Sequence, residues 1–245
     1  MSVSPSIRIT RATIEVPGAR GAPTLKHYLL SSKARTRPAG KAILKDVTLE
    51  ANAGERIGVI GRNGSGKSTL LKMIAGIYPL ASGQRDVRGL VTAVLSPGVG
   101  LDGEASLRHN VRLGLAHMNL LHAYSADLED DILEFSELTD RAGEPFKVLS
   151  SGMKSRLAFS ISLFHSPHIL LLDEVFATGD AAFVHKATSA MRQRLSEAPI
   201  SFLISHDNDL ISDICNRVLL IQDGFLIADG APADVIDRYR HSYQG

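Results

Sequence analysis

The sequence has few of the features that mark secreted, membrane-spanning or nucleic-acid-binding chains. It contains one cysteine, Cys215, so no disulfide can form within the chain, and the apolar pattern around it predicts a buried thiol. No run of about eighteen apolar residues occurs, and the N-terminus has no apolar signal core. A net charge of +1 argues against binding nucleic acid through bulk electrostatics. These absences predict a cytosolic chain with no nucleic-acid partner, while the 44% hydrophobic content is ample for a large core.

The strongest positive signal is a glycine-rich stretch that fits the phosphate-binding loop, a Gly, four residues, then Gly-Lys-Ser/Thr. We expect it to bind nucleotide phosphates through Gly61, Arg62, Asn63, Gly64, Ser65, Gly66, Lys67, Ser68 and Thr69. An apolar strand expected at 56–60 precedes the loop and a helix expected at 70–75 follows it, which is the context that disfavours a chance glycine-rich turn. Glycine lets the backbone aim successive N–H groups at phosphate oxygens. Lys67 is then expected on the β- and γ-phosphates and the Ser68 hydroxyl on Mg²⁺.

Two other apolar strands end in residues that suit phosphate chemistry. The strand at 168–172 leads into Asp173 and Glu174, and the strand at 199–205 leads into His206. Because ligands bind at the carboxyl ends of parallel strands, we expect these side chains beside the loop. Asp173 would hold the hydration shell of Mg²⁺, and Glu174 would polarise the attacking water. His206 is a candidate catalytic residue, with a purely structural histidine as the alternative.

The remaining pattern predicts an alternating α/β chain with a helical insertion. Strands are expected at 7–16 (one strand or a pair), 43–49 and 91–95, helices over 104–140 and 232–241, and a closing hairpin at 217–228 around Asp223-Gly224. The basic loop at 31–41 either faces water or contacts anionic lipid headgroups. Ser150, Ser151 and Gly152 open directly onto a helical run and predict an N-cap.

The phosphate loop, the Leu149 to Met153 signature, Asp173-Glu174 and His206, in that order, resemble the ATP-binding cassette of ABC transporters. The resemblance implies an α/β P-loop NTPase with a mostly parallel core sheet, an antiparallel β subdomain and an α-helical subdomain. It implies one cassette over 1–245, with a RecA-like core and a helical insertion at about 101–160. Ser150, Ser151 and Gly152 would then bind the γ-phosphate of ATP held by a second copy, in a head-to-tail homodimer.

A narrower resemblance concerns cargo. The stretch 173–183, with its Gly-Asp-Ala-x-Phe pattern, and the stretches 134–138 and 149–159 are similar to ATPases that drive export of O-antigen, capsule or teichoic acid. This implies a lipid-linked polysaccharide, a membrane-embedded permease dimer as partner, and a peripheral place at the cytoplasmic face of the inner or plasma membrane. Asp180 would occupy the loop that links the two nucleotide sites of the dimer.

Several features depart from the family pattern. Ser96 stands near the place where cassettes generally carry a glutamine, and Tyr28 is the upstream candidate for stacking on adenine. Some polysaccharide exporters append a carbohydrate-binding domain, and we expect none here. The alternatives are a cassette for another cargo, a soluble cassette in translation or DNA maintenance, and a non-hydrolysing switch. Glu174 argues against the switch.

Overall fold

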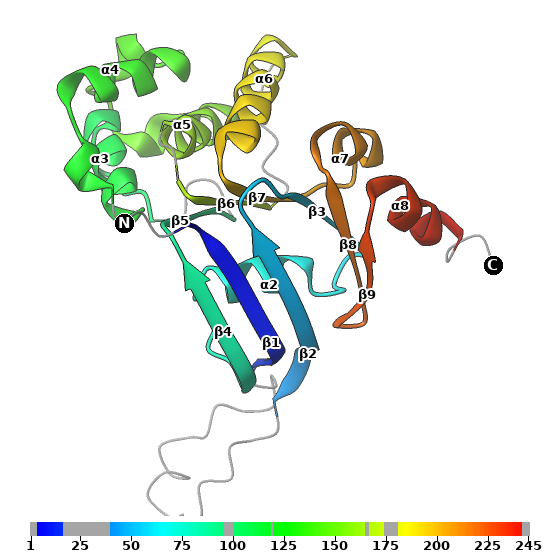
Figure 1. Ribbon diagram of the computed structural model, residues 1–245. Helices are drawn as coiled ribbons and strands as arrows, with labels where there is room; N and C mark the ends of the chain where they lie inside the picture. The colour runs from blue at the N-terminus through cyan, green and yellow to red at the C-terminus, as the bar shows by residue number, and fades with distance from the viewer. Residues whose placement is uncertain are drawn as a thin grey trace, which may run out of the picture.

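The computed structural model describes residues 4–16, 40–95, 100–118, 120–164, 167–173 and 181–241. Figure 1 shows two β-sheets, one helix between them and a layer of further helices on the far side of the larger sheet. The smaller sheet is antiparallel, in the order β2-β1-β4, with β1 at Ser6–Val16, β2 at Lys41–Asn52 and β4 at Ser82–Arg88. Strand β2 exceeds the expected 43–49 because its pairing with β1 continues beyond the apolar run at both ends.

The larger sheet has six strands in the order β5-β6-β7-β3-β8-β9. These strands span Val91–Val94, Ile169–Asp173, Ile200–Ile204, Arg56–Ile60, Arg217–Gln222 and Phe225–Gly230. All neighbours pair in parallel except β8 and β9, which form the predicted hairpin. Its turn residues Asp223 and Gly224 have φ of 50° and 83°, as a tight hairpin turn requires. The expected mostly parallel core sheet is therefore confirmed.

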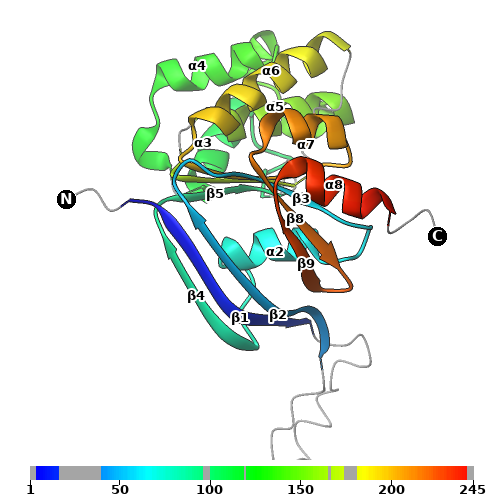
Figure 2. The same ribbon diagram turned by 45° about the vertical axis from the view of Figure 1, so that its right-hand side comes forward.

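Helix α2, Lys67–Ile74, lies between the two sheets (Figure 2). From Leu70 onward it buries apolar residues that share one core with both sheets: Leu70, Leu71, Met73 and Ile74. The helix begins at Lys67, three residues before the apolar run that predicted it, because the phosphate loop leads into it without a spacer. The loop is thereby fixed between β3 and a buried helix.

Strand β1 is one strand rather than a pair, with an irregular register. Ile7, Ile9, Ala12 and Ile14 are all buried, so the alternation shifts by one residue between Ile9 and Ala12. Arg11, at φ 48°, absorbs the extra residue and pairs with Asp46, itself at φ 50°, across the strands at 3.0 Å. A bulge of this kind explains why the apolar spacing in the sequence only approximates a period of two.

The far face of the larger sheet is covered by α5 (Ser151–Leu163), α6 (Ala181–Glu197), α7 (Asn208–Ile214) and α8 (Pro232–His241). Cys215 lies in this core, as predicted, and burial raises the pKa of its thiol to about 12. The sequence pattern did not predict helices α6 and α7. Helix α7 is short, and α6 has an apolar stripe of only four buried side chains, Phe183, Ala187, Met191 and Leu195. Within the ranges listed above, no helix is long and apolar enough to cross a bilayer.

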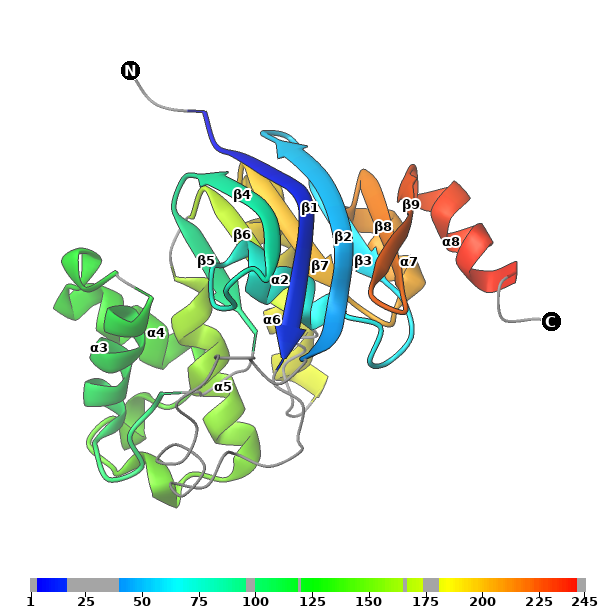
Figure 3. The same cartoon turned by 90° about the horizontal axis from the view of Figure 1, so that it is seen from below.

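The segment expected to be helical over 104–140 contains two separate helices, α3 at Leu107–His117 and α4 at Ala126–Phe135. Figure 3 shows both to one side of the sheets. Ser125 caps α4, because its Oγ accepts a hydrogen bond from the Leu128 N–H at 3.1 Å. With α5, these helices bury a third core of their own, which includes Val111, Ile132 and Ile161.

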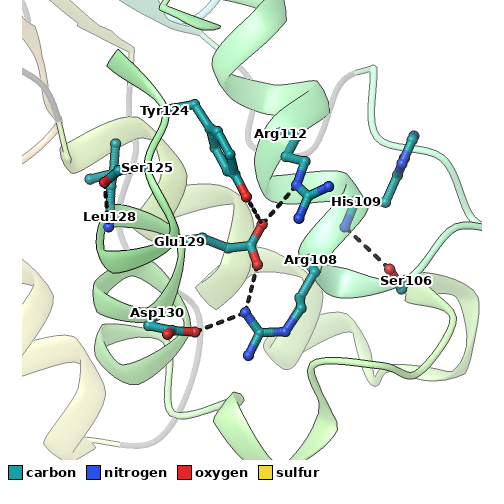
Figure 4. A network of polar contacts seen from close by, with 9 residues as sticks. All are labelled: Ser106, Arg108, His109, Arg112, Tyr124, Ser125, Leu128, Glu129 and Asp130. Atoms are coloured by element: carbon teal, nitrogen blue, oxygen red, sulfur yellow. Dashed lines mark hydrogen bonds and ion pairs between the residues drawn. The ribbon is translucent and has the colours of Figure 1, made fainter. Parts of the chain in front are cut away.

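A buried carboxylate ties α3 to α4 (Figure 4). The Glu129 side chain is 2% exposed and accepts hydrogen bonds from Arg108 at 2.6 Å, Arg112 at 3.0 Å and the Tyr124 hydroxyl at 3.1 Å. Burial alone would raise the pKa of the Glu129 carboxyl, but these hydrogen bonds outweigh it and bring the pKa below the ordinary 4.5. Ionised Glu129 therefore stabilises the fold above pH 4.5, and this contribution is lost as the pH falls through the lower folded pKa.

Replacing Glu129 with Gln keeps the shape and removes the charge. We expect the free energy of unfolding of the variant to be about 2 kcal/mol lower at neutral pH, because the two guanidinium groups lose their anionic acceptor and the amide NH₂ of glutamine cannot accept a hydrogen bond. The difference from wild type should shrink as the pH falls below 4.5, where wild type loses the same charge. Urea unfolding at neutral and acid pH measures it. Asp130→Asn is the control, because Asp130 also pairs with Arg108 but is 59% exposed. A difference that stays constant across this pH range would contradict the assignment.

Candidate functional site

Three strand ends meet at one edge of the larger sheet. Strand β7 lies between β6 and β3, and Ile204 of β7 is level with both Asp173 of β6 and Val59 of β3. The phosphate loop starts two residues beyond Val59, and His206 stands two residues beyond Ile204. Because neighbouring strands are about 4.8 Å apart, Asp173 lies roughly 10 Å across the sheet from the strand that feeds the loop. The structure thus places the loop, Asp173 and His206 at the shared edge that the sequence predicts.

The loop conformation depends on glycine at two positions. Gly61 and Gly66 have φ of 145° and 114°. A Cβ at Gly61 would lie 2.2 Å from the Ile221 carbonyl oxygen, and one at Gly66 would lie 2.9 Å from Leu44 Cδ2. No side chain in the described chain caps α2, whose N-cap is Gly66, so the N–H groups of its first turn are available to an anion.

The loop also holds a buried cation. Lys67 is 7% exposed, and its Nζ donates hydrogen bonds to the carbonyl oxygens of Gly61 at 2.8 Å and Arg62 at 3.1 Å. The ammonium is therefore held across the loop by its own backbone. A buried ammonium is stabilised strongly by an anionic partner, because burial removes most of its hydration.

Ser65 supplies an independent sign of a ligand. The residue is 6% exposed, and its Oγ has no hydrogen-bond partner within the described part of the chain. Buried hydroxyls are nearly always paired, so an orphan of this kind needs an explanation. Ser65 lines a cavity of about 300 Å³ together with Arg62, Asn63, Gly64, Gln222 and Asp223. A phosphate oxygen is a suitable acceptor for this hydroxyl, and the residues present fit a nucleotide phosphate.

The β8–β9 turn is fastened to the phosphate loop. The Gly224 N–H donates to the Ser65 carbonyl at 3.0 Å, and the Gly224 carbonyl accepts from the Lys45 N–H at 2.8 Å. Gln222 and Asp223 therefore reach the cavity, which sequence reasoning missed. The Asp-Gly pair predicted a turn, but no local signal indicated that the turn would meet a loop so distant in the chain.

The predicted metal ligands lie at the same edge. Ser68 is the second residue of α2, and Asp173 is the last residue of β6. Among the residues that the structure describes, no three His, Cys, Asp or Glu side chains gather as a closed metal cage. Mg²⁺ suits such a sparse set, because it keeps several waters and binds through one or two protein oxygens and substrate phosphates. Glu174, Asp180, Ser96 and Tyr28 lie outside the described residues.

His206 follows β7 at an exposed position, and its backbone is held by its neighbours. Asp207 caps α7 by accepting from the N–H groups of Asp209 and Leu210, each at 3.0 Å, and Ser205 Oγ accepts from the Asp207 N–H at 3.0 Å. These bonds fix the direction of the chain at His206. They give His206 a constant place at the sheet edge.

The signature residues come from a different part of the molecule. Ser150 is the N-cap of α5, as predicted, and its Oγ accepts from the Met153 N–H at 3.3 Å. Ser151 and Gly152 are the first two residues of that helix. This end of α5 packs with α3 and α4 through Leu149 and Leu157, whereas Lys67 stands at the sheet edge.

Comparison with known proteins identifies the family. The family model described as ABC transporter matches residues 44–177. The chain belongs to the ABC transporter family. The predicted ATP-binding cassette is confirmed. The roles of the individual residues remain predictions.

Relatives of the family agree with the narrower resemblance. The chain is 40% identical over 183 residues to the O-antigen export system ATP-binding protein RfbE of Yersinia enterocolitica, covering 75% of this chain and 77% of RfbE. It is 38% identical to the teichoic acids export ATP-binding protein TagH of Enterococcus faecalis, covering 80% of this chain but 44% of TagH. The chain thus spans less than half of that relative. The solved ATP-binding subunit of an ABC transporter has the same fold, with a TM-score of 0.71 at 20% identity, over 96% of this chain and 93% of that one.

Proposed function

We propose that this chain is the ATP-binding and ATP-hydrolysing subunit of an ABC exporter for a lipid-linked polysaccharide. The observation that carries the ATPase part is the phosphate loop, with its buried Lys67 and its unpartnered Ser65 hydroxyl, at the same sheet edge as Asp173 and His206. The cargo is supported by relatives named for O-antigen and teichoic acid export and by the Gly-Asp-Ala-x-Phe pattern at 179–183.

Each residue has a defined task in this proposal. Lys67, Ser65 and the N–H groups of the loop bind the phosphates of ATP and orient the γ-phosphate. Ser68 and Asp173 would hold Mg²⁺, which when bound neutralises phosphate charge. Glu174 polarises the water that attacks the γ-phosphorus, and His206 hydrogen-bonds the γ-phosphate from the neighbouring strand. The attack forms a bond from the water oxygen to the γ-phosphorus and breaks the bond from the γ-phosphorus to the β–γ bridging oxygen, so the products are ADP and inorganic phosphate, which carries the water oxygen.

The signature residues complete the site from a second copy. Ser150 and Ser151, which are exposed, and Gly152, which is half-buried, form a helix N-terminus in the helical region, and such a terminus stabilises an anion. We propose a two-fold, head-to-tail homodimer in which they bind the γ-phosphate held by Lys67 of the partner. ATP then closes the pair and hydrolysis releases it.

The proposed setting follows from the proposed transport function. The chain would act as a single cassette over 1–245, with the helical insertion at about 101–160, on the cytoplasmic face of the inner or plasma membrane. It would work on a dimer of permease subunits, with the helical insertion and the region of Ser96 transmitting the closure. The polysaccharide would be handled by the whole complex and not by this chain alone.

The experiment that tests this proposal replaces Glu174 with Gln. We expect turnover to fall at least about a hundredfold while ATP still binds, so that the ATP-bound pair accumulates. Light scattering with and without ATP and Mg²⁺ measures the pairing, and phosphate release measures turnover. Glu197→Gln, an exposed position at the end of α6, is the matched control and should hydrolyse ATP as wild type does. Turnover that survives in Glu174→Gln would overturn the catalytic assignment, and absence of ATP-driven pairing would overturn the dimer.

A further inference from the structure

Helix α4 ends in a conformation that its sequence does not favour. The N–H of Glu137 donates to the Glu134 carbonyl and the N–H of Leu138 donates to the Leu133 carbonyl, both at 3.0 Å, which is the bond pattern of a glycine-terminated helix. The residue at the left-handed position is Glu137, with φ 60°. A residue other than glycine is strained there, so the side chain of Glu137 must contribute something that glycine cannot.

The Glu137 carboxylate makes contacts with two neighbouring helices. Its Oε2 accepts a hydrogen bond from Arg156 of α5 at 2.7 Å, and its Oε1 lies 3.9 Å from the Nζ of Lys186 of α6. The Arg156 side chain is only 14% exposed. The Glu137 side chain is 47% exposed, so the pair is shielded from water on the arginine side only, and the charge-assisted hydrogen bond gives it direction.

Aromatic rings complete the connection. The Arg156 guanidinium carbon lies 4.7 Å from the ring centre of Phe183, which is fully buried at the start of α6. Phe183 meets Phe135 of α4 edge to face, with ring centres 6.1 Å apart. Lys186 donates to the Phe135 carbonyl at 2.9 Å and lies 4.6 Å from its ring centre. We call Phe135, Glu137, Arg156, Phe183 and Lys186 the three-helix clamp.

The clamp residues are close in sequence to both segments that are proposed to reach the partner. Arg156 lies between one and two helical turns from Ser151, and Phe183 follows Asp180 in the same Gly-Asp-Ala-x-Phe stretch. We propose that the clamp is a positioning device that fixes α5 against α4 and α6, so that the signature residues at the start of α5 meet the partner's nucleotide in one orientation. Arg156 and Glu137 are its positioning residues. This inference rests on the proposed function.

The test separates binding of ATP from ATP-driven pairing. Glu137→Gln, Arg156→Gln, the double variant and the charge exchange Glu137→Arg with Arg156→Glu are each made in Glu174→Gln. A fluorescent ATP analogue reports the affinity of the separate chain, and light scattering reports the ATP concentration for half-maximal pairing. We expect unchanged affinity but about fivefold to tenfold more ATP for pairing in each single variant. The double variant should be no worse than the singles, and the charge exchange should recover part of the loss.

A matched control and the contradicting outcomes are available in the same assay. Arg192→Gln removes an exposed ion pair between α6 and Asp213 and should pair like the parent. Single variants that pair like the parent overturn the clamp alone. Variants that lose ATP affinity together with pairing also overturn it, because they reveal a merely structural role. A Glu174→Gln parent that never pairs overturns the proposed function, and the clamp with it.

Discussion

Replacing Lys67 with Met is expected to lower ATP turnover at least about a hundredfold and to weaken ATP binding. The Lys67 ammonium is 7% exposed and is held over the loop by the carbonyl oxygens of Gly61 and Arg62. The Lys67 charge is therefore in position before the nucleotide binds, and the side chain need not rearrange to stabilise the phosphates. Met has a similar length and no charge, so the substitution removes the electrostatic contribution with little change in packing. Phosphate release and titration with a fluorescent ATP analogue measure both effects.

The control for this experiment lies one and a half turns along the same helix. Lys72→Met also removes a lysine from α2, but the Lys72 Nζ lies 5.7 Å from the Tyr78 ring centre and away from the loop, so turnover should stay near wild type. If the proposed transport function holds, cells that carry Lys67→Met should also accumulate lipid-linked polysaccharide that is not exported. Wild-type turnover in Lys67→Met would show that the loop does not act on ATP.

The parts of the fold that the sequence predicts well are those with a strong local signal. The buried strand at 56–60, the phosphate loop and the Asp223-Gly224 hairpin each combine an apolar run with a conformational requirement for glycine or a turn residue. The signals fail where tertiary contacts decide the structure. The register of β1 shifts at Arg11, which pairs with Asp46 across the sheet, and nothing local to 7–16 indicates this shift.

The candidate site divides in the same way. Residues that belong to the phosphate-loop motif or stand at a strand end, such as Lys67, Asp173 and His206, can be placed from the motif and from the rule for parallel sheets. Gln222 and Asp223 reach the cavity only because Gly224 binds Ser65 from a distant hairpin. The sequence does not predict the strained backbone at Glu137. Helices that end with this hydrogen-bond pattern usually have glycine at that position, and the sequence has a glutamate there. Contacts between distant segments thus set the part of the site that sequence reasoning cannot reach.

Replacing Gly61 with Ala is expected to lower the free energy of unfolding by about 2–4 kcal/mol and to abolish measurable ATP binding. The added Cβ would stand 2.2 Å from the Ile221 carbonyl oxygen and 2.8 Å from Ser65 Oγ. The first contact is with the backbone of β8, which pairs in parallel with β3 and cannot move away without breaking that ladder. The loop must therefore shift as a whole, and its N–H groups no longer converge on one phosphate. Urea unfolding and nucleotide titration measure the two losses.

Gly64→Ala distinguishes this clash from the general cost of a left-handed residue. Gly64 has φ 77°, but a Cβ there meets nothing within 4 Å. The variant should lose only about 1 kcal/mol, the conformational cost of alanine at positive φ, and should keep most of its ATP affinity. If the two variants lose equal amounts of unfolding free energy and ATP affinity, the left-handed backbone conformation alone explains the effect, and the contact with Ile221 adds nothing. A larger loss in Gly61→Ala, as we expect, would show that the contact with Ile221 holds the loop in its binding shape.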